Sequence, residues 1–156
     1  MIILIIYINL IEGCLSIKKV KGHMCGIVLD INSHKYFAPL NSPKAIHKKY
    51  SENPTIMYLG ENKEFGIIRF NNMIPVLSSD VKLINVDDVD WKYRLMLNSQ
   101  HRYIQRYSEK VKKKASLLYK LVVYKKDTFL KEICLDFKLL EEKCKDYKRE
   151  KSFEIA

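Results

Sequence analysis

The chain has 156 residues, of which 47% are hydrophobic and 29% are charged, and it carries a formal net charge of +10. This length fits one domain with a substantial core rather than two domains, because a domain of this size buries roughly 70% of its unfolded surface. The hydrophobic and charged fractions are those of an ordinary soluble protein, whereas the net charge is not. The charge therefore favours a polyanionic partner.

The positive charge is concentrated in the second part of the chain. Residues 1–91 carry 10 Lys and Arg against 9 Asp and Glu, whereas residues 92–156 carry 18 against 9. A solvated, lysine-rich surface would give the same excess, and charge alone leaves that interpretation as probable as nucleic-acid binding.

The N-terminus and the cysteines exclude several classes of protein. Residues 1–11 are apolar but lack the basic start and the cleavage site of a signal peptide, and they are too few to cross a bilayer. Cys14, Cys25, Cys134 and Cys144 form no CxxC pair and have no histidine at zinc-finger spacing. We therefore expect a cytoplasmic protein with reduced thiols, no membrane partner, no metal and no cofactor.

Short β-branched runs separated by turn residues predict strands up to about residue 86. Residues 24–31 and 34–40 flank Asn32-Ser33 and predict a hairpin. Residues 55–59 and 65–70 predict a second hairpin, and residues 81–86 predict a further strand. Together these strands would form a small, strongly bent antiparallel sheet.

Beyond Asp87-Asp88 the pattern changes to a helical period. Apolar or buried-type residues recur every three or four positions at Tyr93, Leu97, Gln100, Ile104, Tyr107, Val111, Ala115, Leu118 and Val122. One long helix, or two in line, would pack this stripe against the sheet. Further helices are expected after Asp127 and Asp136, which are plausible N-caps, with Leu140, Cys144 and Tyr147 docking the last one and a frayed tail at residues 149–156.

Four basic residues lie off the apolar stripe and face elsewhere. We call Arg102, Arg106, Lys110 and Lys113 the basic ridge; they are spaced by four, four and three residues.

The segment Asn41-Ser42-Pro43-Lys44 marks the end of a strand and the start of helical residues 45–50. Ser is a favoured N-cap and Pro a favoured first helical residue, so the sequence predicts that Ser42 caps this helix. Lys44 in the first turn conflicts with the helix dipole, and a phosphate bound at the turn would resolve that conflict. The plain alternative is that Ser42 only caps the helix and Lys44 is solvated.

Four segments in order resemble the ToxN/AbiQ family of type III toxin endoribonucleases. They are residues 26–44 (Gly-Ile-Val-Leu-Asp-Ile through Ser-Pro-Lys), residues 70–76 (Phe-Asn-Asn-Met-Ile-Pro-Val) and residues 93–104, followed by Cys134-Leu135-Asp136-Phe137. The resemblance covers roughly residues 25–147. The family usually has Thr-Ser-Pro-Lys where this chain has Asn41 to Lys44, and residues 1–24 differ from the usual family start.

The resemblance implies a single α+β endoribonuclease domain with a Kid/MazF-like fold, a compact bent antiparallel sheet and long C-terminal helices. It implies cleavage of RNA to a 2′,3′-cyclic phosphate and a 5′-hydroxyl without metal. It assigns Lys44 to charge stabilisation, Ser42 and the turn N–H groups to phosphate binding, and Asn41 to orientation. Of the four histidines, we take His34 as the candidate for the base or acid because it lies close to the turn in the sequence.

RNA contacts are expected from the basic ridge and from residues near the turn and on the long helix. The further candidates are Lys18, Lys19, Lys21, Lys35, Gln100 and Tyr103. Gln100 has an alternative role as a satisfied core amide, and Asn72 is expected to be a turn residue.

The implied partners are cellular or phage mRNA as substrate and a small structured repeat RNA as antitoxin, in a symmetric toxin–RNA assembly that acts in abortive infection. An inactive RNA-binding module of the same fold remains the main alternative. The sequence shows no helix-turn-helix spacing that would support a DNA-binding regulator. The only support for a membrane-linked protein is the apolar segment of residues 1–11.

Overall fold

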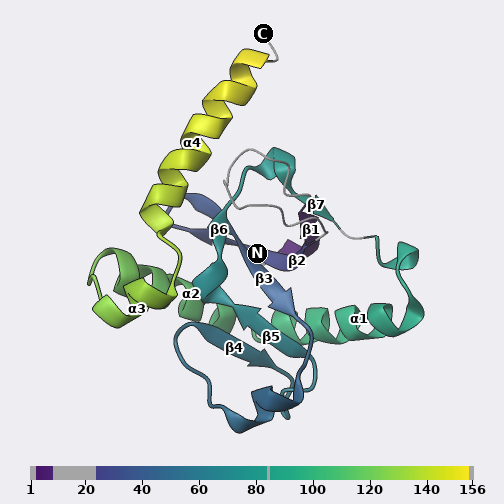
Figure 1. Ribbon diagram of the computed structural model, residues 1–156. Coiled ribbons are helices and arrows are strands. Elements are labelled where there is room, and N and C mark those ends of the chain that lie inside the picture. The colour runs from purple at the N-terminus through teal and green to yellow at the C-terminus, as the bar shows by residue number, and fades with distance from the viewer. Residues whose placement is uncertain (1–2, 9–23, 84, 155–156) are drawn as a thin grey trace.

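The computed structural model describes residues 3–8, 24–83 and 85–154, so Lys18, Lys19 and Lys21 lie outside the described residues. The strands form a seven-stranded antiparallel sheet in the order β4-β5-β3-β2-β1-β7, and β6 pairs with β3 beside this path. Figure 1 shows β3 (His34–Asn41) running from the side of α4 (Phe137–Glu154) towards the hairpin of β4 and β5. The expected α+β fold with a bent antiparallel sheet is confirmed.

The central hairpin is formed by β2 (Met24–Ile31) and β3 (His34–Asn41). Asn32 and Ser33 adopt positive φ angles of 48° and 65°, the conformation that a two-residue turn needs to match the twist of its strands. The predicted hairpin is therefore confirmed, with β3 one residue longer than expected.

The remaining strands are short. β4 (Ile56–Leu59) and β5 (Gly66–Arg69) form the predicted second hairpin, and β1 spans Ile3–Ile8. β6 (Ile74–Pro75) pairs with Tyr36 and Phe37 in the first half of β3, whereas β5 pairs with its last two residues. β3 thus changes partner along its length, which places its C-terminal end beside the second hairpin.

The strand predicted at residues 81–86 is only partly present. β7 spans Lys82–Leu83 and pairs with Ile6 and Tyr7 at the edge of the sheet. The 3-10 helix η4 (Val86–Asp88) follows, because the Asn85 side chain accepts a hydrogen bond from the Asp87 N–H at 3.2 Å and caps it. Two other 3-10 helices are η2 (Phe70–Asn72), which contains Asn72 as a turn residue, and η3 (Ser78–Asp80).

Two consecutive helices, α1 (Trp91–Arg106) and α2 (Ser108–Val123), cover one face of the sheet (Figure 1). The Asp90 side chain caps α1 by accepting from the Lys92 N–H at 3.1 Å. The predicted stripe is confirmed: its members are buried apart from Tyr93 and Tyr107, which are half-buried against the same core.

The C-terminal part forms α3 (Thr128–Ile133) and α4 (Phe137–Glu154). Asp127 and Asp136 cap them, accepting from the N–H groups of Leu130 at 2.9 Å and Leu139 at 3.0 Å, as predicted. Fraying from residue 149 is not observed, because α4 continues to Glu154 and projects beyond the sheet (Figure 1). No helix among the described residues is long and apolar enough to cross a membrane.

Alternation along β3 divides the core between the two faces of the sheet. Tyr36, Ala38 and Leu40 pack in the main core with α1 and α2, whereas Phe37 packs in a smaller cluster with Leu140 of α4. The second face is therefore covered near the start of β3, by α4.

A buried carboxylate ties the two sides of the fold together. Glu141 of α4 is 2% exposed. Its Oε1 accepts hydrogen bonds from the hydroxyls of Tyr36 and Tyr119, each at 2.7 Å, and its Oε2 accepts from the Lys138 ammonium at 2.9 Å. These bonds link β3, α2 and α4, so Glu141 anchors the last helix to the sheet and to the helical layer.

Candidate active site

The segment after β3 forms a turn followed by a short helix. Asn41 is the last residue of β3, and Ser42, Pro43 and Lys44 lead into the 3-10 helix η1 (Ala45–Lys49). Lys44 is the cap of η1, with extended backbone angles of φ −131° and ψ 147°. The prediction that Ser42 caps an α-helix is therefore wrong.

His47 builds this cap in place of the Ser42 hydroxyl. The Lys44 N–H donates to Nδ1 of His47 at 3.2 Å, and the His47 N–H donates to the Lys44 carbonyl at 3.0 Å. The bond to Nδ1 is one half of a capping box, with histidine in the position of the usual Glu or Gln, whereas the bond to the Lys44 carbonyl is an ordinary backbone bond of the 3-10 helix. The Ser42 hydroxyl is not needed to start the helix, and the Lys44 N–H is already occupied.

The three polar side chains of the turn are exposed to solvent. Across the residues described, the Asn41 amide and the Ser42 hydroxyl make no hydrogen bond within the protein, and the Lys44 ammonium makes no ion pair. Charge-assisted hydrogen bonds to phosphate oxygens are among the stronger polar contacts. An ammonium and a hydroxyl that are both free in one turn are therefore available to a phosphate.

A glycine and a buried amide fix the strand end behind the turn. Gly66 has φ +115°, and a side chain there would collide with the Asn41 carbonyl, so the close approach of β5 requires glycine. Gln100 of α1 is 1% exposed, and its Nε2 donates to the Phe65 carbonyl at 2.6 Å. Gln100 thus supports β5 as a core amide, and its buried side chain is not on the surface where an RNA contact was predicted.

Five cations lie on the turn, on η1 or near His47, and we call them the turn patch. They are Lys44, Lys48 and Lys49 on the turn and η1, Lys63 from the β4–β5 turn, and Arg69 at the end of β5. The Lys63 ammonium donates to the carbonyls of His47, at 3.2 Å, and Tyr50, and it lies 4.4 Å from the centre of the Tyr58 ring. Lys63 therefore holds η1 against the second hairpin.

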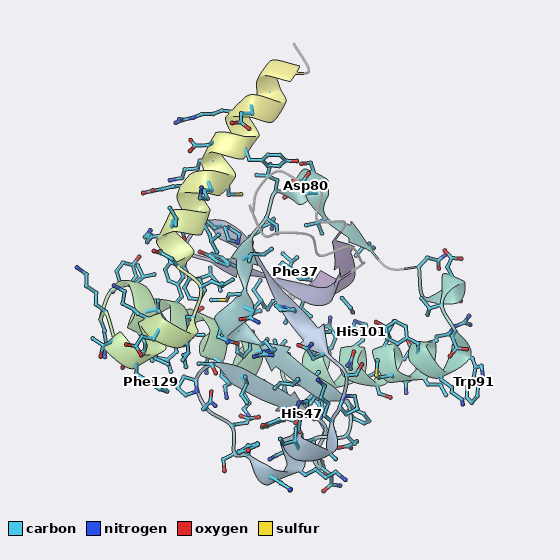
Figure 2. All side chains as sticks on the ribbon, viewed as in Figure 1. Phe37, His47, Asp80, Trp91, His101 and Phe129 are labelled. Carbon is cyan, nitrogen blue, oxygen red and sulfur yellow. The ribbon has the colours of Figure 1, made fainter. Side chains whose placement is uncertain are left out.

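His47 lies on the side of the second hairpin, in the lower part of Figure 2, and Lys44, Lys63 and Arg69 are near enough to affect its titration. Its ring centre is 5.7 Å from that of Tyr58, a buried residue of β4. Burial, followed by the positive charges of Lys44, Arg69 and Lys63, lowers the pKa of His47 below its ordinary value. No sequence pattern singles out His47, because a lysine followed three residues later by a histidine is not the usual capping-box pair.

His34 and Lys35 are not part of this site. They begin β3, whereas Asn41 ends it, and seven strand residues span about 23 Å at roughly 3.3 Å per residue. Nδ1 of His34 lies 3.0 Å from the Asn32 carbonyl oxygen and 3.7 Å from Oε1 of Glu141, and Lys35 pairs with Asp30 at 2.9 Å. The structure therefore places His34 and Lys35 at the opposite end of β3 from the turn, and it does not bring the predicted base or acid together with Lys44.

The basic ridge is exposed, as predicted, and it extends over α1 and α2 across the break at Tyr107. Lys110 lies 3.5 Å from the carboxylate of Glu52, which also accepts from Lys114 at 2.9 Å. Tyr103 is half-buried, with its ring centre 4.5 Å from that of Tyr107 and 6.3 Å from that of Phe65. Among the described residues, Arg102, Arg106 and Lys113 make no ion pair, although Lys113 is close enough to Glu109 to help lower the pKa of that carboxyl.

Other reactive groups offer little chemistry. Burial raises the pKa of the Cys25 thiol to about 12 and that of Cys134 to about 11, so neither is a thiolate at neutral pH. Within the described ranges, no group of three or more His, Cys, Asp or Glu residues is arranged to hold a metal ion.

Comparison with known proteins gives consistent matches. A family model described as the ToxN toxin of the type III toxin–antitoxin system matches residues 16–145. Endoribonuclease ToxN of Pectobacterium atrosepticum is 36% identical over 131 residues, covering 80% of this chain and 74% of the relative. Endoribonuclease AbiQ of Lactococcus lactis subsp. lactis is 30% identical over 138 residues, covering 83% of this chain and 75% of the relative.

Solved structures agree with the fold. A type III toxin that is selectively inhibited by a non-coding RNA pseudoknot superposes with a TM-score of 0.70 at 30% identity, covering 84% of this chain and 83% of that chain. The structure of AbiQ, an anti-phage endoribonuclease of a type III system, superposes with a TM-score of 0.76 at 22% identity. The AbiQ match covers 94% of this chain and 98% of that chain.

Proposed function

The chain belongs to the ToxN family of type III toxin–antitoxin toxins, and we propose that it cleaves single-stranded RNA at the turn formed by residues 41–44. The names of its relatives support an endoribonuclease activity. The observation that carries the assignment of the site is that the Ser42 hydroxyl and the Lys44 ammonium are exposed in one turn and free of protein partners among the described residues. Lys44 is also part of the turn patch.

The proposed reaction uses the 2′-oxygen of the RNA as its nucleophile. This oxygen loses its proton and attacks the adjacent phosphorus, and the bond to the 5′-oxygen of the next nucleotide breaks as that oxygen gains a proton. The products are a 2′,3′-cyclic phosphate and a 5′-hydroxyl. Because negative charge develops on the phosphorane oxygens, the protein must supply a positively charged group at that point.

The turn residues have distinct roles in this reaction. Lys44 stabilises the developing charge, the Ser42 hydroxyl donates to a phosphate oxygen, and the Asn41 amide orients the nucleotide. The Lys44 and Ser42 side chains are exposed, so these roles in the reaction do not compete with a role in folding. The other turn-patch cations attract the neighbouring phosphates of the strand.

The first experiment is an RNase assay of the purified chain in excess EDTA. We expect cleavage of single-stranded RNA to continue, and a matched duplex to be cleaved far more slowly, because A-form pairing opposes in-line attack by the 2′-oxygen. Strict dependence on a divalent ion would contradict the proposal. Binding of RNA without cleavage would instead identify the chain as an inactive RNA-binding member of the family.

We also propose that a small structured antitoxin RNA binds the chain across the active-site turn and the basic ridge, within a closed symmetric assembly of toxin and RNA. The non-coding RNA pseudoknot that inhibits a related toxin supports this partner. The excess of 18 Lys and Arg over 9 Asp and Glu in residues 92–156 is more positive charge than cleavage at a single phosphate requires.

Charge reversal on the ridge tests this contact. We expect Arg102→Glu, Arg106→Glu and Lys113→Glu together to weaken antitoxin binding and to flatten its salt dependence by about 2 in the log–log slope, at roughly 0.7 to 0.9 per phosphate contact. Cleavage of a short oligonucleotide that reaches only the turn should be nearly unchanged. Lys110 is left intact because it contacts Glu52.

A matched control reverses three exposed lysines away from the ridge, Lys125, Lys131 and Lys143. This variant changes the net charge by the same amount, so it removes the general electrostatic contribution from the comparison. Salt-titrated binding gives both affinities and both slopes. Equal losses in the two triple variants would show that the ridge is only a solvated surface.

A further inference from the structure

The backbone of the proposed catalytic lysine is held by a titratable side chain. The Lys44 N–H donates to Nδ1 of His47 at 3.2 Å, and the Lys44 carbonyl accepts from the His47 N–H at 3.0 Å. A ring nitrogen accepts a hydrogen bond only when it carries no proton, so the neutral ring bears its proton on Nε2. His47 can therefore hold Lys44 in this way only in its neutral form.

Protonation of His47 would remove this contact. Nδ1 of an imidazolium carries a proton and is a donor, so it would face the Lys44 N–H, which is also a donor. The imidazolium would also repel the Lys44 ammonium nearby. Loss of this hydrogen bond would displace the backbone of Lys44, the residue whose ammonium must contact the scissile phosphate.

The surroundings of His47 keep it neutral. Lys44 precedes it on the same segment, Lys63 approaches from the β4–β5 turn, Arg69 approaches from β5, and the Tyr58 ring of β4 packs against it. Burial and these three positive charges all disfavour the imidazolium, which lowers the pKa of His47. No carboxylate is among the groups that shift its titration.

We propose that His47 is a positioning residue, whose neutral imidazole holds the Lys44 backbone in the geometry for cleavage and releases it on protonation. This inference rests on the proposed function, since it concerns the same turn. It predicts that cleavage falls at acid pH while RNA affinity does not, because protonation adds a positive charge to the turn patch. The loss of cleavage should follow a pKa below the ordinary histidine value of about 6.5.

Two substitutions separate positioning from proton transfer. His47→Ala removes the acceptor, and we expect the single-turnover cleavage rate at neutral pH to fall by about tenfold to a hundredfold, since a displacement near 1 Å can cost that much. His47→Gln offers an amide oxygen to the Lys44 N–H, as in an ordinary capping box, and it cannot titrate. We expect His47→Gln to restore most of the cleavage rate and to abolish the fall in cleavage at acid pH that we attribute to His47.

The results that overturn the proposal are distinct. If His47→Gln is as slow as His47→Ala while both bind RNA and melt like wild type, the imidazole itself transfers a proton and positioning is wrong. If His47→Ala cleaves like wild type across the pH range, Lys44 does not depend on His47.

An NMR titration without RNA separates this inference from the proposed function. We expect the backbone amide signal of Lys44 to shift with the same midpoint as the ring signals of His47, and not to shift with that midpoint in His47→Gln. A Lys44 amide that ignores the His47 titration would refute positioning even if the chain cleaves RNA. Coupled titration in a chain that cleaves no RNA would instead refute the proposed function and leave the contact between His47 and Lys44 established.

Discussion

Replacing Lys44 with alanine is expected to lower the rate of RNA cleavage by about a hundredfold to a thousandfold, the usual cost of removing one group that stabilises developing charge. The Lys44 ammonium is exposed and has no ion-pair partner in the described part of the chain, so its removal should leave the fold and the melting temperature nearly unchanged. Single-turnover cleavage and thermal unfolding of the same preparation measure both quantities.

Lys48→Ala is the matched control, because Lys48 is an exposed lysine four residues further along, on η1. It removes the same charge from the turn patch without touching the turn, and we expect it to weaken RNA binding slightly while sparing the cleavage rate at saturating RNA. Equal cleavage rates for Lys44→Ala and wild type would refute the role of Lys44. Ser42→Ala should also lower cleavage without destabilising the protein, because Ser42 does not cap η1.

The largest expected effect on stability comes from Glu141→Ala. Glu141 is 2% exposed, and its carboxylate accepts from Tyr36, Tyr119 and Lys138. Breaking a buried, hydrogen-bonded ionic group costs about 3 to 5 kcal/mol, because its partners are left without a substitute. For a chain of this length the melting temperature should fall by about 10 °C, since 1 kcal/mol corresponds to roughly 2 to 4 °C.

Glu141→Gln is the control for this prediction. Its amide oxygen can still accept from both tyrosine hydroxyls, and the half-exposed Lys138 can turn towards water, so the loss should be much smaller. A melting temperature of Glu141→Ala within about 2 °C of wild type, less than the shift expected from 1 kcal/mol, would show that the network is not a main source of stability.

Glu141 also makes stability depend on pH. Burial raises the pKa of this carboxyl, but hydrogen bonds from Lys138, Tyr119 and Tyr36 lower it by more, so the net direction is downward. A carboxyl with a lowered pKa in the folded state contributes stability above its unfolded pKa of about 4.3, and this stability is lost as the pH falls further. The free energy of unfolding of Glu141→Gln should therefore fall less between neutral and acid pH than that of wild type.

Local patterns predicted most of the fold. The hairpin of β2 and β3 followed from Asn32-Ser33 between two apolar runs, and the observed positive φ angles are what that turn requires. The apolar stripe of α1 and α2 and the Asp127 and Asp136 caps also depend on neighbouring residues alone. The strand predicted at residues 81–86 is present only as Lys82–Leu83, because its extent depends on pairing with β1, which is distant in the sequence.

The site was predictable only where its residues are consecutive. Asn41, Ser42 and Lys44 lie together because the turn is local. His34 was chosen for its short distance along the sequence, but an extended strand carries it away from the turn. The network of Glu141 with Tyr36 joins residues 105 positions apart, and no local pattern reports such a contact.

The end groups of the cleaved RNA test the central claim most directly. Purified chain would be incubated in EDTA with a single-stranded RNA, and with the same RNA carrying a 2′-deoxy nucleotide at the mapped cleavage site. We predict a 2′,3′-cyclic phosphate and a 5′-hydroxyl from the first RNA, and no cleavage at the substituted position of the second. Cleavage of the 2′-deoxy RNA at that position, or products bearing a 5′-phosphate, would contradict attack by the 2′-oxygen at the turn of residues 41–44.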